Sequence, residues 1–435
     1  MSARVDTGVD FLGRVPEDWT FDKLKYVLTL SREKNGGTPV GEMLSVSEYT
    51  GVEPKVYDHE EQKRSDEELA DYRVVRRGQL VVNTMWLNHA GLGVSNYEGY
   101  VSPAYRAYWV GPDFERRYLH HLVRSRPYVD HYCSLLYGIR PNSYQVKGTD
   151  FDSTPLLRPP LRAQNGIADY LDSEAARIDA LIDRKQRFID LLVEKRTALI
   201  TRAVTRGLDS NVAMKDSGVP FIGRTPAHWE VGALRRWWSV IDCKHRTVEP
   251  AIEGVPMVSI GQVQNARIDC SDARLAGPDD YSDLIEAGRD PRRGDVVYSR
   301  NASVGLVALV DTDDPVCLGQ DVCMLRSRFG INGLYLTYQL RSLVGAEQLR
   351  ALQRGPTFNR INVGILRAFV VCQPPADEQA KIASFIEKET ACIDALIDRT
   401  QRSIELLREY RRALISSAVT GQIDIPGTKT SEEVA

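Results

Sequence analysis

The sequence predicts an α+β protein made of two similar globular domains, each closed by a long helix, with the two helices paired as an antiparallel coiled coil. Three observations support this prediction. The stretch 176–184 returns almost unchanged at 391–399, an offset of 215 residues (391 − 176) in a chain of 435. Each copy lies in a long amphipathic pattern, and strand-like runs precede each copy. A repeat of this length is domain-sized, so we expect a pseudo-two-fold internal repeat.

Both helical patterns place an apolar residue at every seventh position, with a second apolar row beside it. This spacing is typical of a seam that packs against another helix. Lys185 and Thr400 interrupt the two ladders at equivalent positions, where a polar residue can fix register. Alternatively, each helix could pack only on its own domain; the narrow stripe and the charged opposite face favour the coiled coil. The predicted coiled-coil or partner-interface residues are Leu171, Ile178, Leu181, Ile182, Ile189, Leu192, Leu199, Ile386, Ile393, Leu396, Ile397, Ile404, Leu407 and Leu414.

The composition is that of a globular protein, with 43% hydrophobic and 26% charged residues. No apolar run approaches the roughly eighteen residues of a membrane-spanning helix, and residues 1–10 lack the apolar core of a signal peptide. We therefore expect a cytoplasmic protein with no membrane partner. Seven cysteines without a C-x-x-C pair fit a reducing compartment. The net charge of −3 means that any nucleic-acid contact must come from local patches.

Each half begins with the motif Gly-x-x-Pro-x-x-Trp, at 13–19 and at 223–229. A Gly/Pro turn followed by an anchoring tryptophan is a plausible start for a domain. Further along, a basic pair, a turn glycine and a β-branched strand recur at 76–82 and 292–298.

Beyond that strand the two halves diverge. Each then has a Gly-led polar loop, 137–144 or 354–360, before a proline pair and the long helix. One such loop alone would be interpreted as ordinary surface. The same loop type at the same place in both halves, with different side chains, is typical of a protein that reads two different sites.

Catalytic motifs are missing from the sequence. There is no P-loop and no Asn/Asp-Pro-Pro-aromatic tetrapeptide of an amino-methylating enzyme. His245 lies in the run Asp242–Thr247, which could suggest a metal site. However, no second histidine follows at ligand spacing, and both neighbours of His245 are cationic. A loop that donates hydrogen bonds to DNA fits this composition better.

Over essentially its whole length the chain resembles the specificity subunit of a type I restriction-modification system. The most specific motifs are the Pro-Pro-then-helix junctions with Ile-Asp-Ala-Leu-Ile-Asp in both halves, and the paired Gly-x-x-Pro-x-x-Trp starts. One departure is the first junction, Pro-Pro-Leu-Arg-Ala-Gln-Asn, where the family usually has Glu-Gln after the prolines. The second junction, Pro-Pro-Ala-Asp-Glu-Gln, fits the pattern.

The resemblance implies a non-catalytic subunit that recognises double-stranded DNA. In that family each target-recognition domain reads one half of a bipartite site. Two conserved helices pair antiparallel as a spacer and dock two methyltransferase subunits, and motor-nuclease subunits then join. It implies no cofactor or metal on this chain, with S-adenosylmethionine, ATP and Mg expected on the partner subunits. The alternatives are a scaffold whose two domains bind proteins, and, less favoured, an enzyme that acts alone.

On this basis we predict a first recognition domain at 1–160, a central helix at 161–207, a second recognition domain at 208–375, a C-terminal helix at 376–421 and a tail at 422–435. We expect DNA contacts from the divergent loops, because arginine can pair with guanine and asparagine with adenine. The candidates are Asn88, His89, Arg140, Asn142, Ser143, Tyr144, Lys244, His245, Arg246, Arg300, Asn301, Thr357, Asn359 and Arg360.

Overall fold

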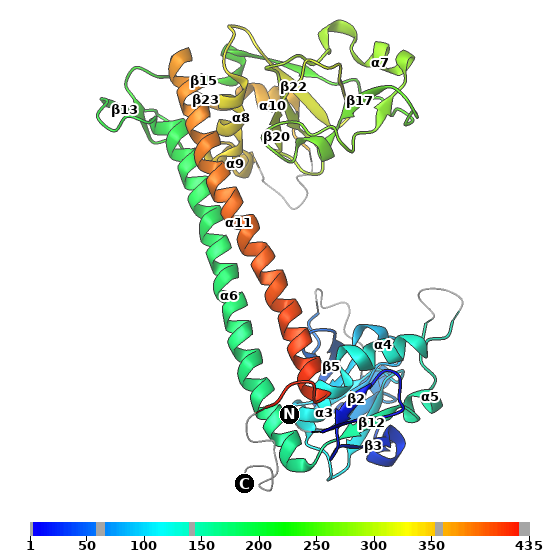
Figure 1. The fold of residues 1–435 in the computed structure, drawn as a ribbon. Coiled ribbons are helices and arrows are strands. Elements are labelled where there is room, and N and C mark those ends of the chain that lie inside the picture. Colours follow the sequence, from blue (N-terminus) through cyan, green and yellow to red (C-terminus); the bar gives the residue numbers. More distant parts are fainter. Residues whose placement is uncertain (1–2, 58–65, 139–143, 353–359, 426–435) are drawn as a thin grey trace. The chain divides into compact units, whose positions relative to one another are not determined.

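The computed structural model describes residues 3–57, 66–138, 144–352 and 360–425 (Figure 1). The chain folds as two compact units, residues 1–185 with 402–435 and residues 186–401. Two long helices, α6 (Leu161–Arg206) and α11 (Ala376–Val419), run through both units. Each unit therefore contains the start of one long helix and the end of the other. These units are defined by contacts in space and combine distant parts of the chain. They therefore do not test the predicted domain boundaries, which stay a prediction.

The first unit contains two four-stranded sheets. One is antiparallel, in the order β4-β11-β8-β9, and the other has the order β6-β5-β10-β7 with a parallel β5/β10 pair. Its strands are β1 (Arg4–Asp6), β2 (Arg14–Pro16), β3 (Thr20–Lys23), β4 (Leu28–Leu30), β5 (Glu42–Ser47), β6 (Gly51–Pro54), β7 (Arg73–Val75), β8 (Leu80–Val82), β9 (Leu92–Val94), β10 (Gly99–Val101), β11 (Arg106–Val110) and β12 (Pro155–Arg158). Its short helices are α1 (Leu24–Val27), α2 (Asp66–Leu69), η2 (Leu87–His89), α3 (Arg116–Val123), α4 (Arg126–Ser134) and α5 (Gly148–Asp152).

The second unit repeats this plan in part, with one four-stranded sheet and one three-stranded sheet, β18-β17-β21. Its antiparallel sheet β16-β22-β19-β20 corresponds to β4-β11-β8-β9, and the pair β15-β23 corresponds to β3-β12. Its strands are β13 (Met214–Asp216), β14 (Arg224–Pro226), β15 (Glu230–Ala233), β16 (Trp238–Asp242), β17 (Val255–Val258), β18 (Leu275–Ala276), β19 (Val296–Ser299), β20 (Val307–Leu309), β21 (Cys317–Leu318), β22 (Val322–Ser327) and β23 (Val370–Gln373). Its short helices are η4 (Leu234–Arg236), η5 (Ile260–Val263), α7 (Pro278–Leu284), η6 (Glu286–Gly288), α8 (Gly333–Arg341), α9 (Leu343–Leu352) and α10 (Val363–Ala368).

Each globular part packs against both long helices. In the first unit one core joins Ile178 of α6 and Leu414 and Ala418 of α11 to buried residues of the sheets and short helices. In the second unit a core joins Val204 of α6 and Ile386 of α11 to globular residues. Burial of apolar side chains is the main favourable term in folding, so both helices contribute to the stability of each unit.

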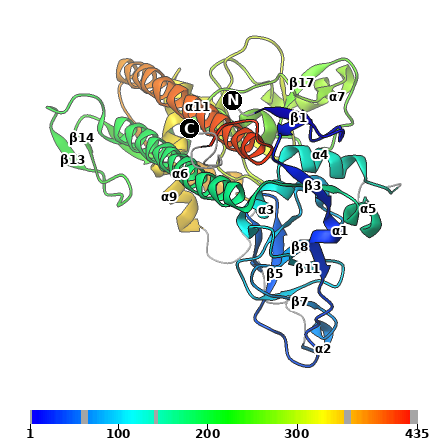
Figure 2. The same ribbon diagram turned by 60° about the horizontal axis from the view of Figure 1, so that its bottom comes forward.

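The helices pair antiparallel in each unit, and they run side by side in two views (Figures 1 and 2). In the first unit Asp179 Oδ1 lies 3.1 Å from Arg411 Nε, and in the second Asp394 Oδ1 lies 2.9 Å from Arg196 Nε. The offset of 215 residues relates Asp179 to Asp394 and Arg196 to Arg411 (394 − 179 and 411 − 196). The repeat seen in the sequence is therefore also a repeat of the helix pairing. This confirms the predicted fold class.

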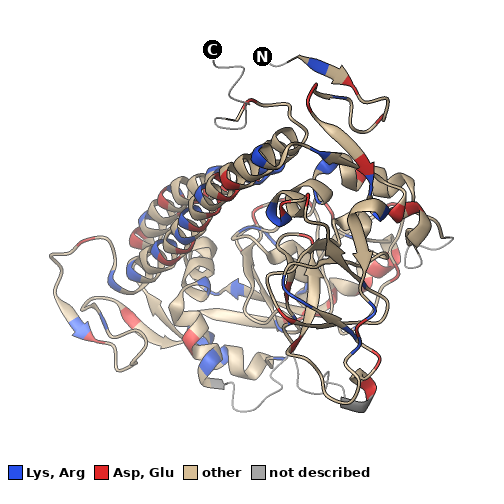
Figure 3. Ribbon diagram, turned by 90° about the horizontal axis from the view of Figure 1, so that it is seen from below, with Lys and Arg blue, Asp and Glu red and all other residues tan. Residues whose placement is uncertain are grey.

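Most predicted seam residues are buried or half-buried, but Leu181 and Leu396 are exposed. These two leucines are equivalent under the repeat, so both helices turn the same position away from the seam. Thr400 is buried in the seam, where its hydroxyl donates to the Leu396 carbonyl at 2.7 Å. Along both helices Lys and Arg alternate with Asp and Glu (Figure 3). Whether Leu181 and Leu396 contact a partner stays a prediction.

The two junctions keep one hydrogen bond and differ in another. Gln379 and its equivalent Gln164 each donate to a carbonyl of the proline pair at 2.8 Å, so this bond is kept in both halves. Glu378 accepts a hydrogen bond from the buried indole N–H of Trp229. The equivalent of Glu378 is Ala163, which cannot accept such a bond.

Within the described ranges, no helix is long and apolar enough to cross a membrane.

We expect Ile386→Ala to destabilise the second unit by about 2–5 kcal/mol, because Ile386 is fully buried and the change leaves a cavity. Leu396→Ala on the same helix removes the same number of atoms from a side chain that is 44% exposed, and should cost less than about 1 kcal/mol. Urea denaturation followed by circular dichroism measures both. Equal losses would contradict the described seam.

Candidate nucleic-acid interface

In the second unit the predicted contact segments meet at one place. The Ile361 N–H donates to the Arg300 carbonyl at 2.8 Å, and Asn301 forms a β-bridge with Arg360. The Arg300 side chain contacts Asp242, at the end of β16. The loops after β16, after β19 and before α10 therefore form one continuous surface. Thr357 and Asn359 lie outside the described residues.

Arg300 is buried, with only 2% of its surface exposed. Its Nη2 lies 2.8 Å from Asp242 Oδ1 and 3.3 Å from His245 Nε2. A guanidinium held in this way cannot reach a base without leaving its partners. The geometry thus favours a role in positioning the loops over the predicted base contact. Asn301 is similarly engaged, since its amide donates to Asp321 Oδ1 at 2.7 Å.

Asp242, Cys243 and His245 bring three potential metal-ligand atoms within 4.8 Å of one another. The Arg300 guanidinium contacts two of these residues, and its positive charge opposes a cation there. Burial raises the pKa of the Cys243 thiol to about 11, so this group is protonated at neutral pH. The arrangement fits an ion-pair network better than a metal centre, and the absence of a metal stays a prediction.

Lys244 and Arg246 are engaged by acidic residues of α7 and η6. Lys244 contacts Asp283 and lies 2.7 Å from Glu286, while Arg246 contacts Asp280 and lies 3.0 Å from Asp283. The hydrogen bond from Lys244, and secondly that from Arg246, lower the pKa of Asp283. These two cations would have to exchange carboxylate partners for phosphates in order to bind DNA.

The first unit has an equivalent surface. The Val146 N–H donates to the Thr84 carbonyl at 3.0 Å, and the repeat relates this bond to the one between Ile361 and Arg300. It joins the turn after β8 to the segment that precedes α5. His89 and Tyr144 are exposed there, and Asn88 is half-buried. The predicted contacts Arg140, Asn142 and Ser143 lie outside the described residues.

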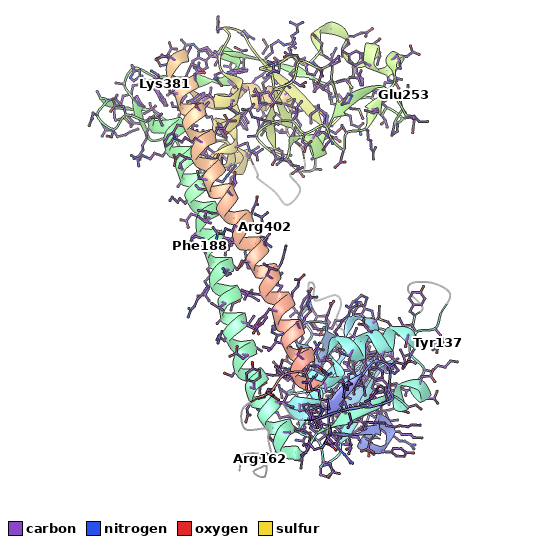
Figure 4. All side chains as sticks on the ribbon, in the orientation of Figure 1. Tyr137, Arg162, Phe188, Glu253, Lys381 and Arg402 are labelled. Carbon is purple, nitrogen blue, oxygen red and sulfur yellow. The ribbon has the colours of Figure 1, made fainter. Side chains whose placement is uncertain are left out.

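Three exposed side chains on this surface were not predicted as contacts. Met85 and Trp86 lie in the same turn as Asn88. Tyr137 lies at the edge of the unit (Figure 4), and the Lys147 ammonium lies 5.0 Å from its ring centroid. The only sequence signal for them is their place in the divergent loops, because apolar and aromatic residues are more often buried.

Comparison with known proteins agrees with this architecture. Residues 252–406 match the family model for the type I restriction modification DNA specificity domain. The putative type I restriction enzyme MjaX specificity subunit of Methanocaldococcus jannaschii is 23% identical, over 95% of this chain and 96% of that protein. The EcoBI specificity subunit of Escherichia coli is 20% identical, over 62% of this chain and 58% of that protein.

Two solved structures share the fold. The HsdS subunit of Thermoanaerobacter tengcongensis has a TM-score of 0.51, and a chain from a study of the assembly and conformational transition of a type I restriction-modification system has 0.64. Each is 17% identical, over 94% of this chain and 98% or 99% of the other. The second unit therefore matches a DNA specificity domain, and the fold repeats its loop surface in the first unit. Residues 252–406 thus resemble a type I restriction modification DNA specificity domain, and the chain as a whole shares the fold of a solved HsdS subunit.

We expect Asp283→Asn to raise the affinity of the assembled complex for DNA by about two- to threefold at low salt. The change removes a negative charge and weakens the contacts of residue 283 with Lys244 and Arg246, which leaves these cations freer to bind phosphates. The gain in affinity should fade at high salt, because salt screens surface charges. Fluorescence anisotropy with a labelled duplex measures the affinity.

The matched control is Asp279→Asn, which changes the same charge on the same helix. Asp279 forms no ion pair with any residue that the structure describes. Equal gains from the two variants would mean that the contacts with Lys244 and Arg246 are unimportant.

Proposed function

We propose that each unit reads one half of a bipartite DNA site. The observation that carries this proposal is the repeated bond between divergent loops, Val146 to Thr84 in one unit and Ile361 to Arg300 in the other. The same backbone scaffold thus presents different side chains in each unit. A framework that is kept while its loop chemistry varies suits a protein that reads two unlike sequences.

The helix pair, in this proposal, sets the spacing of the two half-sites and docks two methyltransferase subunits. The repeated ion pairs Asp179–Arg411 and Asp394–Arg196 support it, because equivalent contacts in an antiparallel pair have two-fold symmetry. Duplex DNA has a matching dyad, so a pseudo-symmetric protein can address two half-sites. Exposed apolar residues at equivalent helix positions, Leu181 with Leu396 and Leu191 with Leu406, offer contact surface to partner subunits.

The chemistry of the complex is assigned to the partners. The methyltransferase subunits would bind S-adenosylmethionine, and motor-nuclease subunits that join them would bind ATP and Mg. This chain would contribute recognition alone, which agrees with the lack of nucleotide-binding and amino-methylating motifs in its sequence.

The first test is reconstitution. The purified chain with its methyltransferase subunits and S-adenosylmethionine should methylate adenine at a bipartite site, and the chain alone should methylate nothing. Sequencing that detects modified bases measures both. Methylation by the chain alone would support the enzyme alternative, whereas a complex that fails to shift DNA in a gel would support the protein-binding scaffold.

The second test uses Arg360, which is exposed beside Asn301. Arg360→Ala should relax one half-site only, with a loss of about 1–3 kcal/mol in discrimination, because each unit reads its own half. Arg350→Ala, an exposed arginine on α9 paired with Glu347, is the control and should leave both halves unchanged. Equal relaxation of both half-sites would refute the assignment of one unit to one half-site.

A further inference from the structure

Met85 and Trp86 form an exposed apolar pair on the turn that follows β8. Their exposed fractions are 44% and 53%. A single exposed apolar residue is common on protein surfaces, whereas two large ones side by side in a divergent loop suggest a contact with another molecule.

The turn that carries them is held rigidly by its own backbone. The Trp86 carbonyl accepts hydrogen bonds from the N–H of His89 at 3.0 Å and of Gly91 at 2.8 Å. Ala90 adopts a left-handed conformation with φ of 51°. A Cβ at Gly91 would lie 2.5 Å from the Trp86 carbonyl oxygen, so only glycine fits there. This backbone geometry is costly for non-glycine residues, and it fixes the main chain that carries Trp86.

The turn is also anchored from below. Leu87 is fully buried in the core of the unit, and Arg124 donates to the Ala90 carbonyl at 2.9 Å. Burial lowers the pKa of Arg124 to about 10, which leaves it protonated at neutral pH, so these bonds persist. With Leu87 inward, Met85 and Trp86 remain outward. A preorganised apolar group loses little conformational entropy when it binds.

The equivalent turn in the second unit has the same base but different side chains. The Ser299 N–H donates to the Leu306 carbonyl at 2.8 Å, as the Asn83 N–H donates to the Gly91 carbonyl. The second turn carries Asn301, Ala302 and Ser303 in place of the large apolar pair. The pair is therefore not a requirement of the fold, and it distinguishes the two recognition surfaces.

We propose that Trp86, together with Met85, is a specificity-determining residue that packs against thymine methyl groups in the half-site of the first unit. The thymine methyl is the apolar group that duplex DNA exposes in its major groove, and apolar side chains recognise it by contact. His89, whose ring lies 5.5 Å from that of Trp86, supplies a polar neighbour for an adjacent base or phosphate. This inference rests on the proposed function, in which the first unit reads one half-site.

The test uses the assembled complex and its mapped site. Trp86→Ala should lower discrimination at the first half-site by about tenfold or more and leave the second half-site unchanged. Replacing thymine by uracil in the first half-site removes only the methyl group, and it should weaken the wild-type complex by a similar factor. The same replacement should cost the Trp86→Ala complex little further, because two changes to one contact are not additive.

The control is Trp109→Ala, on β11, which removes an indole of 43% exposed fraction from the same unit and should behave as wild type. Trp86→Phe should recover part of the discrimination. If the wild-type complex reads a bipartite site but Trp86→Ala discriminates equally well, or uracil has no effect, the thymine contact is wrong. If the wild-type complex reads no bipartite site, the proposed function fails as well.

Discussion

The structure depends on the packing of two helix segments into each globular core. In the first unit Ile178 of α6 and Leu414 of α11 share a core with the sheets, and in the second unit Val204 and Ile386 do the same. Each core is therefore completed by residues that lie far away in the sequence. A unit that lacked either helix segment would expose a large apolar surface.

The loops are free to differ because the scaffold beneath them is determined by the backbone and by buried side chains. In the second unit Arg300 holds Asp242 and His245, and its carbonyl accepts from Ile361. In the first unit Arg124 and Leu87 anchor the corresponding turn. Exposed residues above these anchors can change with little effect on stability, and such residues can carry specificity.

Much of the architecture could be predicted from sequence, because heptad periodicity and an internal repeat are strong, long-range signals. The bonds between loops could not, since they join residues such as Val146 and Thr84 that have no shared pattern. The residue type of Arg300 suggested a contact with a DNA base. In the structure, however, Arg300 is buried and its guanidinium pairs with Asp242. Likewise, the sequence placed Leu181 and Leu396 among the coiled-coil or partner-interface residues, but it could not show that the rotation of the helices turns both away from the seam.

The central claim is that the helix pair sets the distance between two half-sites, and insertion of three heptads into both helices tests it most directly. Insertion after Arg187 and after Arg402, which are equivalent under the repeat, would preserve the seam and lengthen the pair by about 31 Å. That is close to one turn of duplex DNA, so the half-sites should return to the same face. Methylome mapping of the variant with its partner subunits should find both half-sites unchanged and the spacer longer by about nine or ten base pairs. An unchanged spacer would contradict the account.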